Sequence, residues 1–149
     1  TADSLDIVGD PLNGPARQHD VRVLPNGNIS MFDNRTQFTN ASPPLAPVTG
    51  AARYVEYAID ETAGTATMVR EIRNPSGFFS GATGSARLQP DGGVVINWGA
   101  LPGTIFSEYD ADNELLFELH MPGLNSSYRT VKEPVTAFDI AELRQTAGR

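Results

Sequence analysis

Apolar and polar residues alternate along two short stretches of the chain, 19–33 and 84–98, and a turn interrupts each stretch near its middle. Alternation with a period of two is typical of a strand that buries one face. The turns contain Pro-Asn-Gly at 25–27 and Pro-Asp-Gly at 90–92. Proline fixes φ, while Asn, Asp and Gly tolerate the positive φ that a tight hairpin needs. Each stretch therefore predicts two antiparallel strands joined by a hairpin.

The two stretches align at an offset of 65 residues, which places Arg22 on Arg87, Pro25 on Pro90 and Gly27 on Gly92. A second pair of segments, 55–72 and 106–119, aligns at an offset of 52 residues before its turn and 47 after it. This order predicts four antiparallel strands within 19–73 and four more within 84–121. Four-stranded units repeated along a chain are typical of the blades of a β-propeller. We therefore expect the chain, 1–149, to be an all-β propeller fragment with about two blades.

The remaining segments predict shorter elements. Residues 34–50 contain three prolines and little periodicity, so we expect an exposed loop there. The unit 127–147 is expected to hold a closing strand, at 127–132, and a short helix. Thr136 is the expected N-cap of that helix, and a short edge strand is expected near Leu5 to Val8.

Composition excludes several classes of function. The chain has 11 Lys and Arg against 18 Asp and Glu, a net charge of −7. This charge argues against binding to nucleic-acid phosphates and against docking on an anionic membrane. The chain contains no cysteine, which removes disulfides, thiolate metal sites and Cys nucleophiles. Its apolar stretches are far shorter than the ~20 residues that span a bilayer, and its first residues do not resemble a signal peptide.

At 149 residues, with 40% hydrophobic and 19% charged residues, the chain is composed like one ordinary globular domain. The repeats change this picture. Two four-stranded blades leave sheet edges and faces that normally pack against further blades. We therefore expect either additional blades or further copies of the chain to cover them.

The chain has two histidines, and the pattern places them differently. His19 begins the first strand of a blade, where inner strands start beside the central channel of a propeller. A neutral imidazole there can act as a nucleophile or a general base. Asp20 is expected to point to the opposite face, because side chains alternate along a strand. His120 is expected to be a partly exposed strand residue near the end of an outer strand.

Other polar motifs have simpler interpretations. Residues 110–114 carry clustered oxygen ligands, but the glycine and glutamate positions of a calcium-binding loop hold Leu115 and Met121. We therefore expect a hairpin turn there and no metal site, and the sequence indicates no cofactor. Asn-x-Ser/Thr sequons, which fit an extracytoplasmic chain, occur at Asn28, Asn34, Asn40 and Asn125. Asn34 and Asn40 are expected to be accessible in the long loop.

The motifs together resemble the arylsulfotransferase family. The resemblance rests on QHDVRVLPNGNISMFDN at 18–34, RYVEYAID at 53–60, GSARLQPDG at 84–92, NWG at 97–99, EYDAD at 108–112 and SYR at 127–129. It implies a six-bladed propeller that acts outside the cytoplasm. It also implies transfer of a sulfuryl group from a phenolic ester to a phenol, through a sulfated histidine and without a nucleotide donor.

Carried onto this chain, the resemblance implies that His19 is the catalytic histidine. It further implies that Arg35 or Arg53 binds the sulfate, since a planar guanidinium can pair with two sulfate oxygens. The second unit departs from this pattern, because Gly84 aligns with His19. The alternative is a non-catalytic propeller that binds a ligand or partner through the 34–50 loop, because propellers host many functions.

Overall fold

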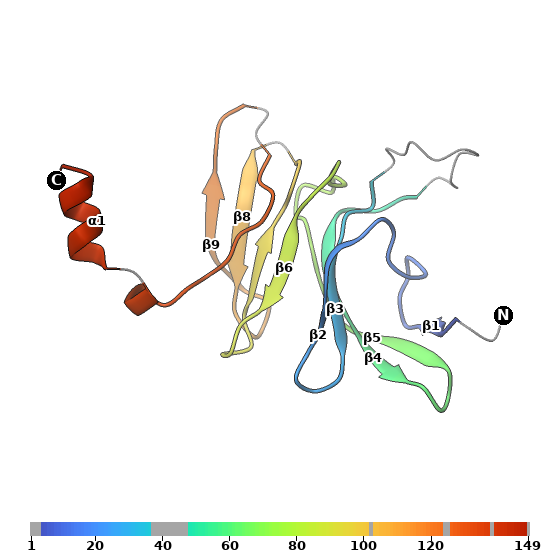
Figure 1. The fold of residues 1–149 in the computed structure, drawn as a ribbon. Helices are drawn as coiled ribbons and strands as arrows, with labels where there is room; N and C mark the ends of the chain where they lie inside the picture. Colours follow the sequence, from blue (N-terminus) through green and yellow to red (C-terminus); the bar gives the residue numbers. More distant parts are fainter. Residues whose placement is uncertain (1–3, 37–47, 102, 124–125, 138, 149) are drawn as a thin grey trace.

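The computed structural model of the chain describes residues 4–36, 48–101, 103–123, 126–137 and 139–148 (Figure 1). These residues form two β-sheets that lie face to face, followed by an extended segment and one short α-helix. The prediction of an all-β chain with two antiparallel sheets and a short C-terminal helix is confirmed. None of the helices found in the described ranges is long and apolar enough to cross a membrane.

The first sheet contains β1 (Asp6–Val8), β2 (His19–Val23), β3 (Ile29–Asp33), β4 (Arg53–Asp60) and β5 (Thr65–Arg73). Strands β2 to β5 follow one another in antiparallel order, as their alternating patterns predict. The expected edge strand near residue 5 exists as β1, and it pairs in parallel with β5. The sheet order is therefore β1-β5-β4-β3-β2, with β2 at the opposite edge from β1.

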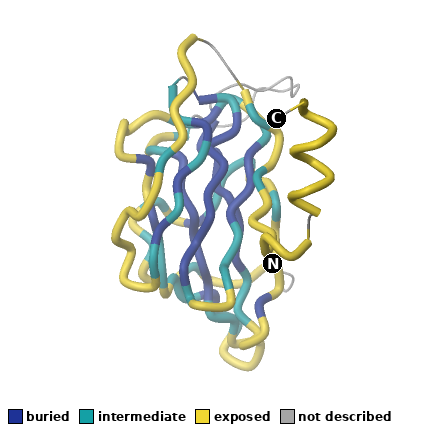
Figure 2. Tube along the Cα trace, turned by 90° about the vertical axis from the view of Figure 1, so that its left-hand side faces the viewer, coloured by how far each residue is buried: buried dark blue, intermediate teal, exposed yellow. Residues whose placement is uncertain are grey.

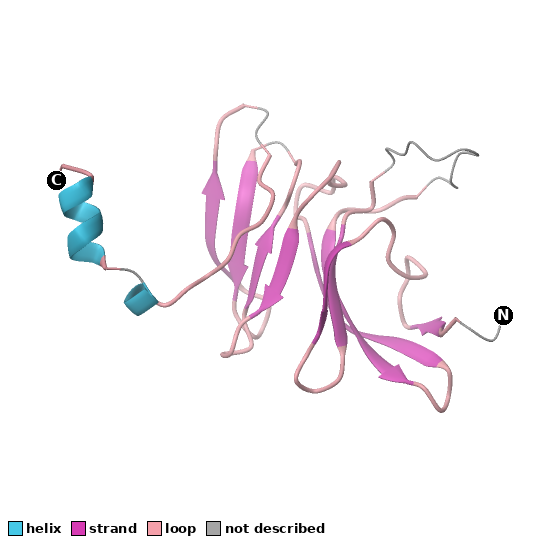
Figure 3. Ribbon diagram, viewed as in Figure 1, coloured by secondary structure: helices cyan, strands magenta, loops and turns pink. Residues whose placement is uncertain are grey.

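The second sheet contains β6 (Ser85–Leu88), β7 (Val94–Asn97), β8 (Thr104–Tyr109) and β9 (Leu115–His120), all antiparallel in chain order. Contacts of β6 with β2 and β3 bring the two sheets together along the edges where each four-stranded meander begins. Figure 3 shows the two sheets facing each other, with loops gathered at the end where β2 and β6 begin.

The first hairpin turn of each sheet has the same hydrogen bonds. Leu24 N–H donates to the Asn28 carbonyl at 2.8 Å, and Gln89 N–H donates to the Gly93 carbonyl at 2.8 Å. Gly27 and Gly92 each have a φ of 86°, in the left-handed region where glycine is favoured. The Asp110 turn is also confirmed as a hairpin, since the Asp110 carboxylate accepts from the N–H groups of Asp112 and Glu114.

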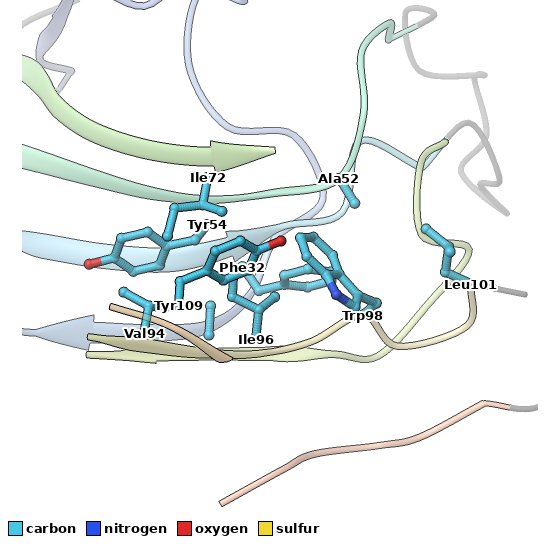
Figure 4. Packing of buried hydrophobic residues seen from close by; sticks show 10 residues of the cluster. Phe32, Ala52, Tyr54, Ile72, Val94, Ile96, Trp98, Leu101 and Tyr109 are labelled. Carbon is cyan, nitrogen blue, oxygen red and sulfur yellow. The ribbon is translucent and has the colours of Figure 1, made fainter. Parts of the chain in front are cut away.

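The main hydrophobic core lies between the two sheets, as the close-up in Figure 4 shows. It consists of Phe32, Ala52, Tyr54, Ile72, Ala86, Val94, Ile96, Trp98, Leu101 and Tyr109. Phe32 and Trp98 meet edge to face with ring centroids 6.1 Å apart, so the contact joins β3 to the end of β7. In Figure 2 the buried residues run along the central strands, while β9 and α1 are mostly exposed.

Two expectations for the C-terminal segment were wrong. The segment expected as a strand, 127–132, runs as a loop beside β6. It is held largely through side chains, for example by Ser85 of β6, whose Oγ accepts from Thr130 N–H at 3.3 Å, and by Asn97 of β7, whose Nδ2 donates to Thr130 Oγ1 at 2.8 Å. Thr136 does not cap the helix and lies in a short 3₁₀ turn instead. Helix α1 (Ile140–Thr146) is capped by Asp139, whose carboxylate accepts from Glu142 N–H.

Candidate functional site

His19 is the first residue of β2 and lies opposite Phe32 of β3. A bulge interrupts the pairing between His19 and Arg22, and Asp20 has a φ of 51°, which is rare for a residue with a Cβ. The plain alternation expected here is therefore broken. A bulge bends the strand and re-aims its side chains, and such bulges are over-represented next to active sites.

The His19 ring is exposed and is oriented by a neighbouring amide. Its Nδ1 lies 2.7 Å from Oδ1 of Asn34, the residue that directly follows β3. Asn34 is fully buried, and its Nδ2 donates to the Thr83 carbonyl at 2.8 Å. No hydrogen bond within the described residues reaches Nε2 of His19. The ring is thus held on one side and open on the other.

Asp20 links the starting strands of the two sheets. Its buried carboxylate pairs with Arg22 at 2.8 Å and with Arg87 of β6 at 3.3 Å. Burial alone would raise the pKa of Asp20, but the hydrogen bonds from Arg22 and Arg87 outweigh burial and lower the pKa below its ordinary value. Asp20 is therefore ionised at neutral pH and fixes the strand next to His19.

Arg53 is fully buried and is surrounded by carboxylates. Its guanidinium pairs with Asp10 at 2.8 Å, with Asp33 at 3.0 Å and with Glu71 at 3.0 Å. Burial alone would lower the pKa of Arg53, but the three acidic partners raise it above its ordinary value. For Asp33, burial is the stronger influence and raises the pKa of its carboxyl. The guanidinium donors of Arg53 are occupied by this network.

Arg35 is also buried, and its φ of 53° lies in the left-handed region. Its Nε donates to the Thr49 carbonyl and its Nη1 to the Gly14 carbonyl, both at 2.8 Å. Asp33 lies 3.6 Å from the same Nη1. Arg35, at the start of the long loop, therefore fastens the end of that loop and the segment that leads into β2.

The structure brings the two predicted arginines together around Asp33 and Gly14. Arg53 Nη2 lies 3.5 Å from the Gly14 carbonyl that Arg35 also binds. Among the described contacts, none joins His19 directly to either guanidinium. The connection is indirect, because Asn34 lies between Asp33 and Arg35 in the chain and contacts the His19 ring. The candidate site therefore consists of an exposed histidine and a buried charged network, which Asn34 connects.

Asn34 is a residue of the candidate site that the sequence did not indicate. We expected it to be accessible in an exposed loop, and this expectation was wrong, because Asn34 is fully buried. The one available signal was its position at the end of a strand that pairs with the strand of His19. Of the other sequons, Asn28 donates to Glu56 at 2.6 Å, while Asn40 and Asn125 lie outside the described residues, as does most of the long loop.

His120 has a different environment from His19. It is exposed at the end of β9, where its Nε2 lies 2.9 Å from Glu118 and its Nδ1 lies 3.2 Å from Thr104 Oγ1. Both ring nitrogens are therefore occupied. Among the residues that the structure describes, no group of three or more potential metal ligands gathers at one place.

Residues 10–129 match the family model described as Arylsulfotransferase (ASST). The matched range contains His19 and the network behind it. No curated protein sequence matches the chain.

Proposed function

Since the chain belongs to the arylsulfotransferase (ASST) family, we propose that it transfers a sulfuryl group from a phenolic sulfate ester to a phenol, with His19 as the nucleophile. The observation that carries this assignment is the ring itself. His19 is exposed, its Nδ1 is held by Asn34, and its Nε2 faces no protein partner among the described residues. His120, by contrast, has both nitrogens engaged.

The proposed reaction has two displacement steps. In the first, the lone pair of Nε2 attacks sulfur, an N–S bond forms, and the S–O bond to the aryl group breaks as the phenolate leaves with the electron pair. In the second, the oxygen of the acceptor phenol attacks sulfur, the N–S bond breaks and His19 is restored. The phenolate that leaves in the first step takes up a proton from water, and the acceptor phenol gives up its proton to water in the second step, so no proton is consumed overall. A covalent intermediate divides one difficult transfer into two easier ones.

In this proposal Arg35 and Arg53 position the site. They hold Asp33 and the Gly14 carbonyl, while Asp33 Oδ1 accepts from Ala16 N–H at 2.9 Å and so fixes the segment before β2. To bind sulfate, either arginine would exchange a carboxylate or carbonyl partner for a sulfate oxygen. Sulfate binding by Arg35 or Arg53 therefore stays a prediction from the resemblance.

The proposal extends to a larger propeller outside the cytoplasm. Apolar side chains are exposed on an edge strand of each sheet, including Val21 and Val23 on β2 and Leu116 and Phe117 on β9. Surfaces of this kind fit packing against further sheets or copies of the chain. The second candidate function is a non-catalytic propeller that binds phenolic ligands, and the same exposed histidine and hydrogen-bonding network would serve it.

The test measures release of nitrophenol from 4-nitrophenyl sulfate, with phenol as acceptor, by the full-length protein. We expect acceptor-dependent release by the wild type, and we expect His19→Ala to lower its rate on the order of 10³-fold or more. His120→Ala is the matched control, because it removes the other histidine, and it should leave the rate within about twofold of wild type.

Two outcomes would overturn the catalytic proposal. One is a wild-type rate no higher than the uncatalysed background, and the other is equal activity of His19→Ala and wild type. Saturable binding of the aryl sulfate without turnover would instead favour the non-catalytic binding function.

A further inference from the structure

We propose that Asn34 is a positioning residue that holds His19 in the tautomer with its proton on Nδ1 and its lone pair on Nε2. The tautomer follows from the hydrogen-bond geometry alone, while its consequence for catalysis rests on the sulfuryl transfer proposed above.

The first step concerns the orientation of the Asn34 amide. One end of this amide lies 2.8 Å from the Thr83 carbonyl. A carbonyl oxygen can only accept a hydrogen bond, so the NH₂ group of Asn34 must face it. Asn34 is fully buried, and its own carbonyl accepts from Ser80 N–H at 2.9 Å, so the residue is fixed by both its side chain and its backbone.

The second step assigns the proton on the histidine. With its nitrogen turned to Thr83, Asn34 presents Oδ1 to His19 Nδ1 at 2.7 Å. Oδ1 has no proton to give, so Nδ1 must be the donor. In the neutral ring the other nitrogen, Nε2, then carries the lone pair that a nucleophile needs.

The third step concerns charge. When Nε2 bonds to sulfur, the imidazole ring gains positive charge, and the N–H at Nδ1 becomes a stronger donor. A hydrogen bond from a charged donor is about twice as strong as one between neutral groups. The Asn34 carbonyl therefore stabilises the sulfated histidine more than the resting one, which is the differential stabilisation that accelerates a reaction.

This arrangement depends on both sheets. Asn34 directly follows β3, whereas Thr83 lies two residues before β6. The acceptor that orients the amide is thus supplied to a histidine of the first sheet by the connection that leads into the second. The tautomer of His19 is set only when the two sheets are packed together.

The test records two-bond hydrogen–nitrogen NMR correlations of the full-length protein carrying isotope-labelled histidine, with His19→Ala and His120→Ala used to assign the rings. The pattern of these correlations distinguishes a proton on Nδ1 from one on Nε2. We expect the Nδ1-protonated form of His19 to dominate at a pH where the ring is neutral. A wild-type ring protonated on Nε2 would overturn the proposal without any variant.

Two variants separate positioning from a merely structural role. Asn34→Ala and Asn34→Asp both lose the hydrogen bond to Thr83, but only Asp keeps an acceptor for Nδ1. We expect Asn34→Ala to show both tautomers and to lower kcat ~10- to 100-fold, with a smaller change in KM. Asn34→Asp should keep the Nδ1 proton, recover part of kcat and shift the activity profile to higher pH, because a carboxylate favours the protonated ring.

The outcomes distinguish this proposal from the proposed function. If the wild type has no transferase activity but His19 carries its proton on Nδ1, the proposed sulfuryl transfer is refuted and the tautomer assignment is not. An active enzyme whose Asn34→Ala variant keeps both the Nδ1 tautomer and the wild-type kcat would refute the role of Asn34. Equal loss of kcat in the Ala and Asp variants would also refute it, because that result indicates only a structural contribution from the Thr83 bond.

Discussion

At the scale of single residues, the most unusual feature is a guanidinium with no exposure to solvent. Arg53 is accompanied by three carboxylates, those of Asp10, Asp33 and Glu71. Taking charges out of water is costly, and the attraction between buried partners offsets this cost only when their geometry is good. The network is therefore better understood as a device that fixes the segments around the histidine than as a source of net stability.

Replacing Arg53 by an uncharged residue tests how far the fold depends on this charged network. Arg53→Met keeps an apolar side chain of similar reach but leaves the three carboxylates without their shared partner. We expect the free energy of unfolding to fall by about 3–5 kcal/mol, as for other broken buried ion pairs. Urea denaturation followed by the fluorescence of Trp98, the one tryptophan in the chain, measures the change.

Arg73→Met is the matched control. Arg73 pairs with Glu71 at 2.9 Å, but 46% of its side chain is exposed. An exposed pair of this kind contributes less than about 1 kcal/mol. Similar losses in the Arg53 and Arg73 variants would contradict the assignment of Arg53 as the centre of the network.

Arg53→Met should also change how the free energy of unfolding depends on pH. Burial alone would raise the pKa of Asp10, but hydrogen bonds from Arg53 and Tyr57 lower it below its ordinary value of 3.8. A carboxyl with a depressed pKa contributes stability that is present above its ordinary pKa and lost as the pH falls toward the folded value. The deficit of Arg53→Met relative to wild type should therefore shrink as the pH falls below 3.8. Denaturation curves at a series of acidic pH values test this, and a deficit that grows there would contradict it.

The sequence predicted some of these residues by position but not by environment. His19 could be placed at the start of an edge strand, because alternation and turn chemistry define the hairpin that follows it. The burial of Arg53 could not be predicted, because its partners come from distant parts of the chain, Asp10 being 43 residues away. Asn34 was missed for a related reason, since its partner Thr83 belongs to the connection between the two sheets.

At the scale of elements, Gly84 shows why the second sheet has no counterpart of His19. Gly84 comes immediately before β6 with a φ of 103°. A Cβ added there would lie 2.3 Å from Cε1 of Phe32 and 3.0 Å from the Asn97 carbonyl oxygen. The space that a histidine would need is filled by a core residue of the neighbouring sheet. The two sheets are thus similar in strand order but differ at this end.

Gly84→Ala should therefore destabilise the fold in two ways. The substitution forces a Cβ into the left-handed region, and it also clashes with Phe32. We expect a loss of about 1–3 kcal/mol from overpacking in addition to the backbone strain. Thermal unfolding measured by circular dichroism provides the comparison with wild type.

Gly64→Ala measures the cost of the backbone strain without a side-chain clash. Gly64 has a φ of 70° in the turn between β4 and β5, and nothing lies within 4 Å of an added Cβ. The expected loss there is only about 1 kcal/mol. If the two alanine variants unfold at the same temperature, the clash with Phe32 contributes nothing and this explanation of Gly84 fails.

The local sequence pattern predicts some strands of this chain but not others. The hairpins follow from residues close together in sequence, so alternation and Pro-Asn-Gly or Pro-Asp-Gly turns predicted them. The 127–132 segment has similar alternation but forms no strand, because its neighbour β6 is short and meets it mainly through side chains such as Ser85. Whether a segment becomes a strand depends on the backbone beside it, which local pattern does not contain.

At the scale of the whole molecule, the two sheets are joined by more than apolar packing. Arg70 of β5 extends to the second sheet, where its Nη1 donates to the Gly92 carbonyl at 2.8 Å, its Nη2 to the Asp110 carbonyl at 3.0 Å and its Nε to Asn113 at 2.8 Å. Its guanidinium also lies over the Tyr54 ring, 5.9 Å from the centroid. A single side chain thus binds two hairpin turns of the second sheet, β6–β7 and β8–β9, at the end of the molecule away from His19.

This connection predicts that Arg70→Ala weakens the association of the sheets without disturbing the site. Hydrogen bonds from a charged donor are worth more than neutral ones, but Arg70 is only half-buried, so we expect a loss of about 1–3 kcal/mol in the free energy of unfolding.

Arg70→Lys is the control for charge, because its ammonium cannot reproduce the planar fork that serves three acceptors. It should be destabilised nearly as much as the alanine variant. Urea denaturation followed in parallel by Trp98 fluorescence and circular dichroism measures both variants. A lysine variant as stable as wild type would show that charge alone, and not the bridging geometry of Arg70, holds the two sheets together.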